Sequence, residues 1–371
     1  MTTTTTGMTE PVVGPVHGSV IEGSRVAVPR LVRHRLTLAD GHQVGVAVCG
    51  EGMPVVLVHG FSGEGILYAQ TLARLVRMGL KVIAVDVAGH GATEGLPTGG
   101  GDVAGYAALL SRVLDTLGVE RAILAGHSLG GRLVSEVAAG EPARAVAVVL
   151  IDAAVGATWD RLVGVARVAP PVLAGMGTLL VADLLTTLPL LRDRTQARKL
   201  SRLAAPTVVG HLRRPWRLVG PAVSLFRSRP SQEAIVALAE AGVPVVVIHG
   251  DRDVVVPHRT ARDAALAAEG WLVTVHGGSH SWLLKDPETL PAIVSELLGG
   301  PLGEVRDRVL AEAGLDPATA TPAEIEDVFL PVDALVRVLA TPTTGADSDD
   351  EGAPRSHPPR RPRYRWTVER P

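Results

Sequence analysis

Cysteine is almost absent from this 371-residue chain, which contains only Cys49. A single cysteine excludes an internal disulfide framework and a metal site built from several thiolates. This fits a reducing compartment, so we predict a cytoplasmic location. The chain also lacks an excess of either charge, with a net charge of -2 at pH 7. Without a strongly basic balance, we expect a small-molecule partner and no nucleic acid.

Targeting and membrane signals are also missing. Residues 1–32 lack the basic start and the continuous apolar run of a secretory signal, and we interpret them as a flexible leader. Residues 162–185 are long and apolar, but Arg167 and the pair Pro170-Pro171 interrupt them. A spanning helix needs about 20 mostly apolar residues. We therefore expect no stable membrane span here, and interpret the segment as a lid over an apolar pocket.

Short β-branched runs alternate with helical patterns over residues 33–154 and again over 236–300. The predicted strands are 54–60, 81–86, 121–128, 145–152, 244–250 and 271–278, after a hairpin over 33–50 that turns at Asp40-Gly41. The predicted helices are 67–78, 103–118, 129–140, 257–268 and 288–298. Nearly continuous Val, Ile, Leu and Ala in the strands favours a mostly parallel sheet with helices on both faces.

The remaining segments break this rhythm. Residues 155–235 contain helical fragments and no convincing strand, which predicts a helical cap inserted into the α/β core. Residues 301–340 predict a short helical extension. Residues 341–371 pass from an acidic cluster to a Pro/Arg-rich end, and this composition predicts a disordered tail.

Ser128 lies in the pentapeptide G-H-S-L-G, between a predicted strand and a predicted helix. A turn this tight forces the serine into strained backbone geometry, and it needs glycines two positions away because side chains there would clash. Such a turn exposes the hydroxyl and leaves the Leu129 N–H free to bind a substrate oxygen. The alternative is that Ser128 is only a helix cap.

A serine nucleophile needs a base, and the base needs an acid. In this architecture both should follow the serine on loops at the carboxyl ends of later strands. His280, in the glycine-rich loop after the last predicted strand, is the predicted base. For the acid we favour Asp253, which lies deeper in its loop than Asp251; Asp152, after the preceding strand, is the competing choice.

The remaining site predictions concern the second oxyanion donor, the substrate pocket, and metal or cofactor binding. The main chain of Phe61, in VLVHGFSG, is the second predicted oxyanion donor beside Leu129. Cap residues that could shape a hydrophobic substrate pocket are Trp159, Leu179, Leu180 and Trp216. We predict no metal, because His59, His90 and Asp86 have irregular spacing, and no cofactor, because no dinucleotide-binding or phosphate-binding glycine motif occurs.

The motifs HGFSG, DVAGHG, GHSLGG, HGDRDVVVP and GGSHSWLLKDPE stand in the order found in the α/β-hydrolase superfamily. Over about residues 33–300 the chain resembles the serine-nucleophile branch with a helical cap. The resemblance implies an α/β-hydrolase fold with a mostly parallel eight-stranded sheet. It also implies Ser128 as nucleophile, His280 as base, Asp253 as acid, and the Phe61 and Leu129 backbones as oxyanion hole.

We therefore expect a carboxylic ester hydrolase that acts on a small molecule with a hydrophobic acyl or alkyl group, through an acyl-enzyme. C–C bond hydrolysis or thioester cleavage on the same triad is the first alternative. A non-catalytic ligand-binding protein of the same fold is the second. The sequence yields no prediction of the oligomeric state.

Overall fold

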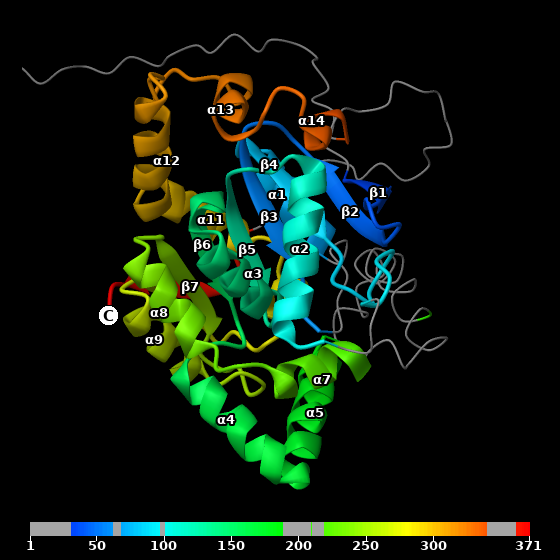
Figure 1. Cartoon of the computed structure of the whole chain (residues 1–371). Helices are drawn as coiled ribbons and strands as arrows, with labels where there is room; N and C mark the ends of the chain where they lie inside the picture. The colour runs from blue at the N-terminus through cyan, green and yellow to red at the C-terminus, as the bar shows by residue number, and fades with distance from the viewer. Residues whose placement is uncertain (1–30, 62–67, 97–100, 188–208, 210–218, 340–360) are drawn as a thin grey trace, which may run out of the picture.

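A nine-stranded sheet forms the centre of the molecule (Figure 1). The computed structural model describes residues 31–61, 68–96, 101–187, 209, 219–339 and 361–371. The strands are β1 (Val32–Thr37), β2 (Gln43–Cys49), β3 (Met53–Val58), β4 (Leu80–Val85), β5 (Ala122–His127), β6 (Ala145–Ile151), β7 (Val245–Gly250), β8 (Trp271–His276) and β9 (Arg365–Glu369). Their order in the sheet is β1-β2-β4-β3-β5-β6-β7-β8-β9.

The pairing is parallel from β4 through β8 and antiparallel at both edges. β1 and β2 form the predicted hairpin, with Gly41 at φ +85° in its turn. Every residue of β3, β4, β5, β6 and β7 is buried. This burial explains their continuous apolar sequences, because helices cover both faces of a parallel sheet.

Two predictions about the chain's end are wrong. The sheet has nine strands rather than eight, because Arg365–Glu369, expected to be disordered, form β9 on the exposed edge of β8. Trp366 and Val368 alternate with exposed residues and pack against the core. A five-residue strand with two apolar side chains has too weak a pattern to stand out from the basic residues around it.

Helices flank and extend the sheet. They are α1 (Ala69–Val76), α2 (Val103–Leu117), α3 (Leu129–Gly140), the 3-10 turn η2 (Pro142–Arg144), α4 (Ala157–Val168), α5 (Pro170–Leu185), α7 (Val219–Arg227), α8 (Gln232–Glu240), α9 (His258–Ala267), α10 (Trp282–Lys285), α11 (Thr289–Leu298), α12 (Pro301–Glu312), α13 (Pro322–Phe329) and α14 (Leu335–Leu339). Contacts link α2, α3, α8 and α9 in one layer, and α1, α11 and α12 in another.

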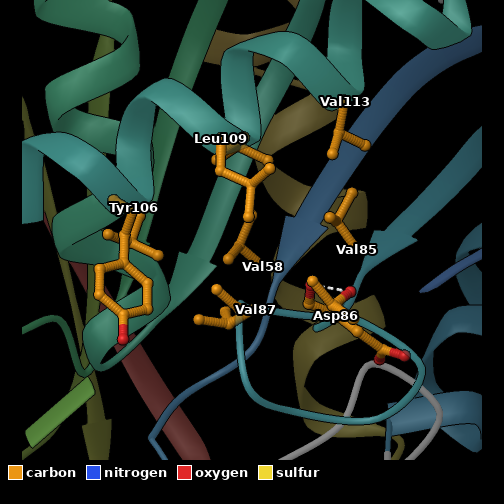
Figure 2. A pocket seen from close by; sticks show the side chains of 11 residues that line it. Val58, Val85, Asp86, Val87, Tyr106, Leu109 and Val113 are labelled. Carbon is orange, nitrogen blue, oxygen red and sulfur yellow. Dashed lines mark hydrogen bonds between the residues drawn. The ribbon is translucent and has the colours of Figure 1, made fainter. Parts of the chain in front are cut away.

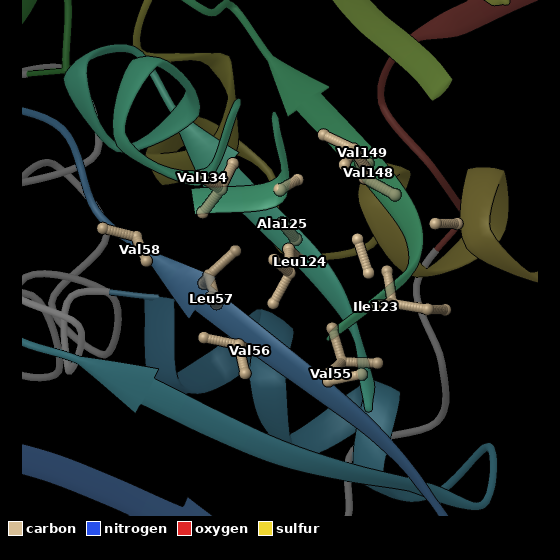
Figure 3. Packing of buried hydrophobic residues seen from close by; sticks show 14 of the residues in the cluster. Val55, Val56, Leu57, Val58, Ile123, Leu124, Ala125, Val134, Val148 and Val149 are labelled. Carbon is tan, nitrogen blue, oxygen red and sulfur yellow. The ribbon is translucent and has the colours of Figure 1, made fainter. Parts of the chain in front are cut away.

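Part of the hydrophobic core lies where α3 packs on β3, β5 and β6. Val55–Val58 of β3 pair with Ile123–Gly126 of β5, and Val134 of α3 packs above them (Figure 3). Burying large aliphatic side chains contributes about 1.5–3 kcal/mol each. This rigid centre holds the β5–α3 turn in a fixed position.

The cap consists, in its described part, of α4, α5 and α7, which project beyond the core in Figure 1. The carboxylate of Asp160 in α4 accepts hydrogen bonds from the backbone of Ser231 and Gln232 at the start of α8, which ties the cap to the core. No strand occurs in the described part of the insertion. Among the described helices, none combines the length and apolarity needed to cross a bilayer.

The extension after residue 300 forms three helices, α12 to α14, at the amino ends of the strands. Glu326 of α13 makes a buried ion pair with Lys81 at the start of β4, with Nζ and Oε1 3.1 Å apart. The other oxygen of Glu326 accepts the N–H of Gly52, just before β3. One buried carboxylate thus attaches the extension to two central strands.

Candidate active site

Ser128 lies at the sharp turn between β5 and α3. Its backbone has φ 54° and ψ -117°, a region that non-glycine residues rarely adopt. A Cβ on Gly126 would lie 2.3 Å from the Gly130 carbonyl carbon, and a Cβ on Gly130 would lie 2.1 Å from the Val58 carbonyl oxygen. The glycines are therefore required by close backbone contacts, as the pentapeptide predicts.

The Ser128 hydroxyl does not cap the helix that follows it, so the alternative interpretation as a helix cap is wrong. Its O–H donates instead to Nε2 of His280, with 3.1 Å between the two atoms. Nδ1–H of the same ring donates to Oδ2 of Asp253 at 2.7 Å. The three predicted side chains thus form one hydrogen-bonded line, although they come from three separate loops.

Electrostatics reinforce this line. Burial alone would lower the pKa of His280, but the neighbouring carboxylates, Asp253 first and then Asp152 and Asp183, together outweigh burial and raise the pKa above its ordinary value. Burial alone would raise the pKa of Asp253, but the charge and hydrogen bond of His280 outweigh it and keep the pKa low. The backbone N–H groups of Val255 and Val256 both donate to Oδ1 at 2.8 Å, which fixes the carboxylate plane.

The two competing acids have other partners. Asp251 is exposed and accepts hydrogen bonds from His276 and from the Gly277 N–H in the next loop, so it stabilises the turn. Asp152 is fully buried and accepts from the Gly250 N–H and from the indole of Trp282. Neither carboxylate has a hydrogen bond to His280 in the described part of the chain.

The predicted oxyanion donors Phe61 and Leu129 lie in the two loops that meet at Ser128. Leu129 is the first residue of α3, so its N–H has no acceptor within the helix. Nδ1–H of His59 donates to the Gly60 carbonyl at 2.7 Å, and a Cβ on Gly60 would lie 3.1 Å from Cβ of Ser128. Since the C=O and N–H of a trans peptide point in opposite directions, fixing the Gly60 carbonyl also fixes the Phe61 N–H.

His59 and His90 support this loop through their hydrogen bonds. Nε2 of His59 accepts the Val87 N–H at 2.9 Å, while Nε2–H of His90 donates to the Phe61 carbonyl. Burial, with a contribution from His90, lowers the pKa of His59 to about 3, so this ring is neutral.

One group of buried side chains in the described residues has metal-ligand spacing: Asp152, His249 and Asp253, with ligand atoms within 4.8 Å of one another. Their hydrogen bonds do not fit a metal. Oδ2 of Asp253 accepts from His280, and both oxygens of Asp152 accept N–H groups. A cation here would compete with the hydrogen bond that holds the His280 ring.

Supporting residues that sequence reasoning missed lie immediately beside the predicted ones. His127 is adjacent to Ser128; its Nδ1 accepts the Tyr68 hydroxyl and its Nε2–H donates to the His280 carbonyl at 3.1 Å. Trp282 follows His280 by two positions and contacts Asp152. The sequence signal for both supporting residues was a side chain with a polar group, His127 or Trp282, within two positions of a predicted catalytic residue.

The predicted substrate residues are only partly placed. Trp159 is buried in a cluster with Ala154, Val163 and Val256 between cap and core. It also lines a hollow with Arg132 and Asp160, which has no triad residue in its lining. Leu179 and Leu180 lie on α5, Leu179 exposed and Leu180 half-buried, and Trp216 lies outside the described residues.

A second hollow lies between α2 and the carboxyl ends of β3 and β4, lined by residues such as Tyr106, Leu109 and Val58 (Figure 2). It has room for about one water molecule. It is therefore too small to hold an ester substrate.

The fold and the hydrogen-bonded line together define an alpha/beta hydrolase. The sequence profile of the alpha/beta hydrolase family matches residues 55–292, well over half of the chain. The chain belongs to this family.

Two of the relatives that match by sequence have names of the haloperoxidase type. A provisionally named non-heme haloperoxidase of Mycobacterium phage D29 is 34% identical over 266 residues, covering 70% of this chain and 92% of that protein. A non-heme chloroperoxidase of Streptomyces lividans is 28% identical over 282 residues, covering 69% of this chain and 95% of that protein.

Solved structures share the fold. An esterase of Rhodococcus superposes with a TM-score of 0.56 at 24% identity, over 72% of this chain and 98% of that one. An enol-lactonase of Burkholderia xenovorans superposes with a TM-score of 0.55 at 21% identity, over 72% of this chain and all of that one. At these identities the likeness concerns the fold alone.

Proposed function

We propose that this alpha/beta hydrolase cleaves carboxylic esters through a serine nucleophile, with Ser128, His280 and Asp253 as its catalytic triad. The observation that carries the proposal is the continuous hydrogen-bonded line, with 3.1 Å from Ser128 Oγ to His280 Nε2 and 2.7 Å from His280 Nδ1 to Asp253 Oδ2. A nucleophile, a base and an orienting acid within hydrogen-bond reach are what acyl transfer by serine requires.

The reaction begins when Ser128 Oγ attacks the ester carbonyl carbon and its proton passes to Nε2 of His280. The negative carbonyl oxygen accepts the N–H groups of Phe61 and Leu129. His280 then returns the proton to the departing alcohol, which leaves an acyl-enzyme. Water, deprotonated by His280, attacks that acyl group and releases the carboxylic acid and free Ser128.

The substrate class follows from the cap. Its helices α4 and α5 present apolar side chains with large exposed fractions, namely Val165, Val168, Leu179, Val181, Leu184 and Leu185. The Asp183 carbonyl of α5 accepts a hydrogen bond from the hydroxyl of Ser281, next to His280. Apolar side chains on this helix therefore support a hydrophobic acyl or alkyl group. The other triad reactions, thioester cleavage and C–C bond hydrolysis, use the same first step and stay as alternatives.

The test is Ser128→Ala, assayed with a p-nitrophenyl ester and with a fluorophosphonate probe. We expect turnover to fall by about three orders of magnitude or more with the fold unchanged by circular dichroism, because only the transition-state chemistry is removed. Ser279→Ala is the matched control, since Ser279 lies on the loop beside His280 but bonds Lys285. Probe labelling that survives in Ser128→Ala contradicts the proposal.

A second candidate comes from the names of the relatives. If hydrogen peroxide replaces water as the attacking nucleophile, the acyl-enzyme releases a peroxyacid, which can oxidise halide. Haloperoxidase-type halogenation that needs peroxide, a carboxylic acid and an intact Ser128 would favour this candidate over simple ester hydrolysis.

A further inference from the structure

Asp152 forms hydrogen bonds to both of the loops that carry the proposed acid and base. Its Oδ1 accepts the N–H of Gly250 at 2.9 Å, three residues before Asp253. Its Oδ2 accepts the indole N–H of Trp282 at 2.7 Å, two residues after His280. We propose that Asp152 is a positioning residue, which holds the acid loop and the base loop at the separation that the reaction of Ser128 requires; this rests on the proposed function.

The backbone around Asp152 is also joined to the nucleophile. The Ser128 N–H donates to the Ile151 carbonyl at 2.9 Å, and the Ala154 N–H donates to the Ser128 carbonyl at 3.2 Å. The Asp152 N–H donates to Ile248 of the neighbouring strand at 2.9 Å. The carboxyl ends of β5, β6 and β7 are therefore connected by the segment 151–154, which contains Asp152.

Asp152 adopts a backbone conformation that non-glycine residues rarely take. Its φ is +44°, in the left-handed region, and its side chain has no exposed area. Strained residues of this kind persist only where the surrounding structure fixes them, and they concentrate at functional sites. A purely apolar residue would fill the space without holding either loop.

Four titratable side chains lie around the Asp152 carboxyl. Nε2 of His127 lies 3.8 Å away and Nδ1 of His249 lies 3.9 Å away, and Asp253 and His280 are also close. Burial, and then the charge of Asp253, raises the pKa of Asp152 well above its ordinary value. This direction disfavours a second negative charge beside Asp253.

His249 is the other buried ring beside Asp152. Its Nε2–H donates to the Val256 carbonyl at 2.8 Å, which leaves Nδ1 as an acceptor. That Nδ1 is buried, lies 3.9 Å from Oδ1 of Asp152 and has no hydrogen-bond partner among the described residues. Burial lowers the pKa of His249 to about 4, so the ring is neutral and adds no charge beside Asp152.

The test compares Asp152→Asn and Trp282→Phe, with Asp251→Asn as the matched control. Asparagine has one acceptor oxygen for two N–H donors, so it can hold only one of the two loops. Phenylalanine keeps the shape of Trp282 without its N–H. Asp251 also joins the two loops, through Gly277 and His276, but at an exposed position. Its replacement should leave ester turnover within about twofold of wild type.

We expect kcat per active site to fall about 10- to 100-fold in Asp152→Asn and about 10-fold in Trp282→Phe, with KM within about threefold. Fluorophosphonate titration supplies the number of active sites. The double variant should lose less than the product of the two single effects, because both changes act on the Asp152–Trp282 pair. If Asp152 acts through position, the acid limb of the pH profile should stay close to that of wild type.

Two results would overturn the proposal. If kcat per labelled site is unchanged while only thermal stability falls, Asp152 is structural. If the acid limb of Asp152→Asn moves to lower pH, Asp152 acts as a charge on His280 rather than through position.

Failure of the proposed function is separable from failure of this inference. If wild-type protein neither labels nor turns over any ester, the low-field proton resonance of His280 Nδ1–H becomes the readout. Its loss in Asp152→Asn and Trp282→Phe, with retention in Asp251→Asn, supports positioning by Asp152. Its retention in all three variants contradicts it.

Discussion

Replacing Asp253 by asparagine tests the geometry of the site most directly. In wild type, Oδ1 of Asp253 accepts two backbone N–H groups, from Val255 and Val256, and Oδ2 accepts Nδ1–H of His280. In Asp253→Asn the amide oxygen has to remain with the two backbone donors. The amide NH₂ then faces Nδ1 of His280, which must give up its proton and become an acceptor.

This exchange places the His280 proton on Nε2, the nitrogen that faces Ser128. A ring protonated there cannot accept the serine proton. We therefore expect kcat to fall by about four orders of magnitude, or about 5 kcal/mol of transition-state stabilisation at about 1.36 kcal/mol per tenfold change. Because both backbone donors hold the same oxygen, the amide cannot rotate to avoid the wrong tautomer.

The assay is kcat/KM for a p-nitrophenyl ester measured across pH. The base must be neutral, so wild-type activity is lost as pH falls through the pKa of His280, which Asp253 raises above the ordinary value of about 6.5. Removing that charge leaves burial as the dominant effect on the pKa of His280. The acid limb of the remaining activity should therefore lie at a lower pH than in wild type. A variant that keeps more than about a tenth of wild-type kcat would refute this account of the site.

Two further predictions concern the parts of the chain beyond the catalytic core. Glu326→Ala leaves Lys81 buried without its partner, so it should lower the free energy of urea unfolding by about 3–5 kcal/mol. The double variant Lys81→Met with Glu326→Leu should recover most of that loss. Equal stability of the single and double variants would argue against the buried pair. Removing residues 361–371 takes away β9 and the Tyr364 ring that packs against Trp282. This truncation should lower kcat severalfold and should also lower the melting temperature. An unchanged kcat would argue against a link between β9 and the site.

Much of the fold was predictable because its signals are local. The continuous apolar runs of β3 to β7 reflect burial on both faces, and the hairpin turn follows from Asp40-Gly41. β9 was not predictable in this way. Its pairing depends on the unoccupied edge of β8, about 90 residues earlier in the chain, which no short window of sequence contains.

The sequence by itself determined the strained turn at Ser128, because the sterics of Gly126, Ser128 and Gly130 act within five residues. It also determined the chain order of the three residues proposed as the triad. Only the tertiary structure decided which of Asp152, Asp251 and Asp253 forms a hydrogen bond with His280, since that choice depends on distances between loops that the register of different strands sets. Short-range sterics can be read along the chain, whereas contacts between strand ends exist only once the sheet has formed.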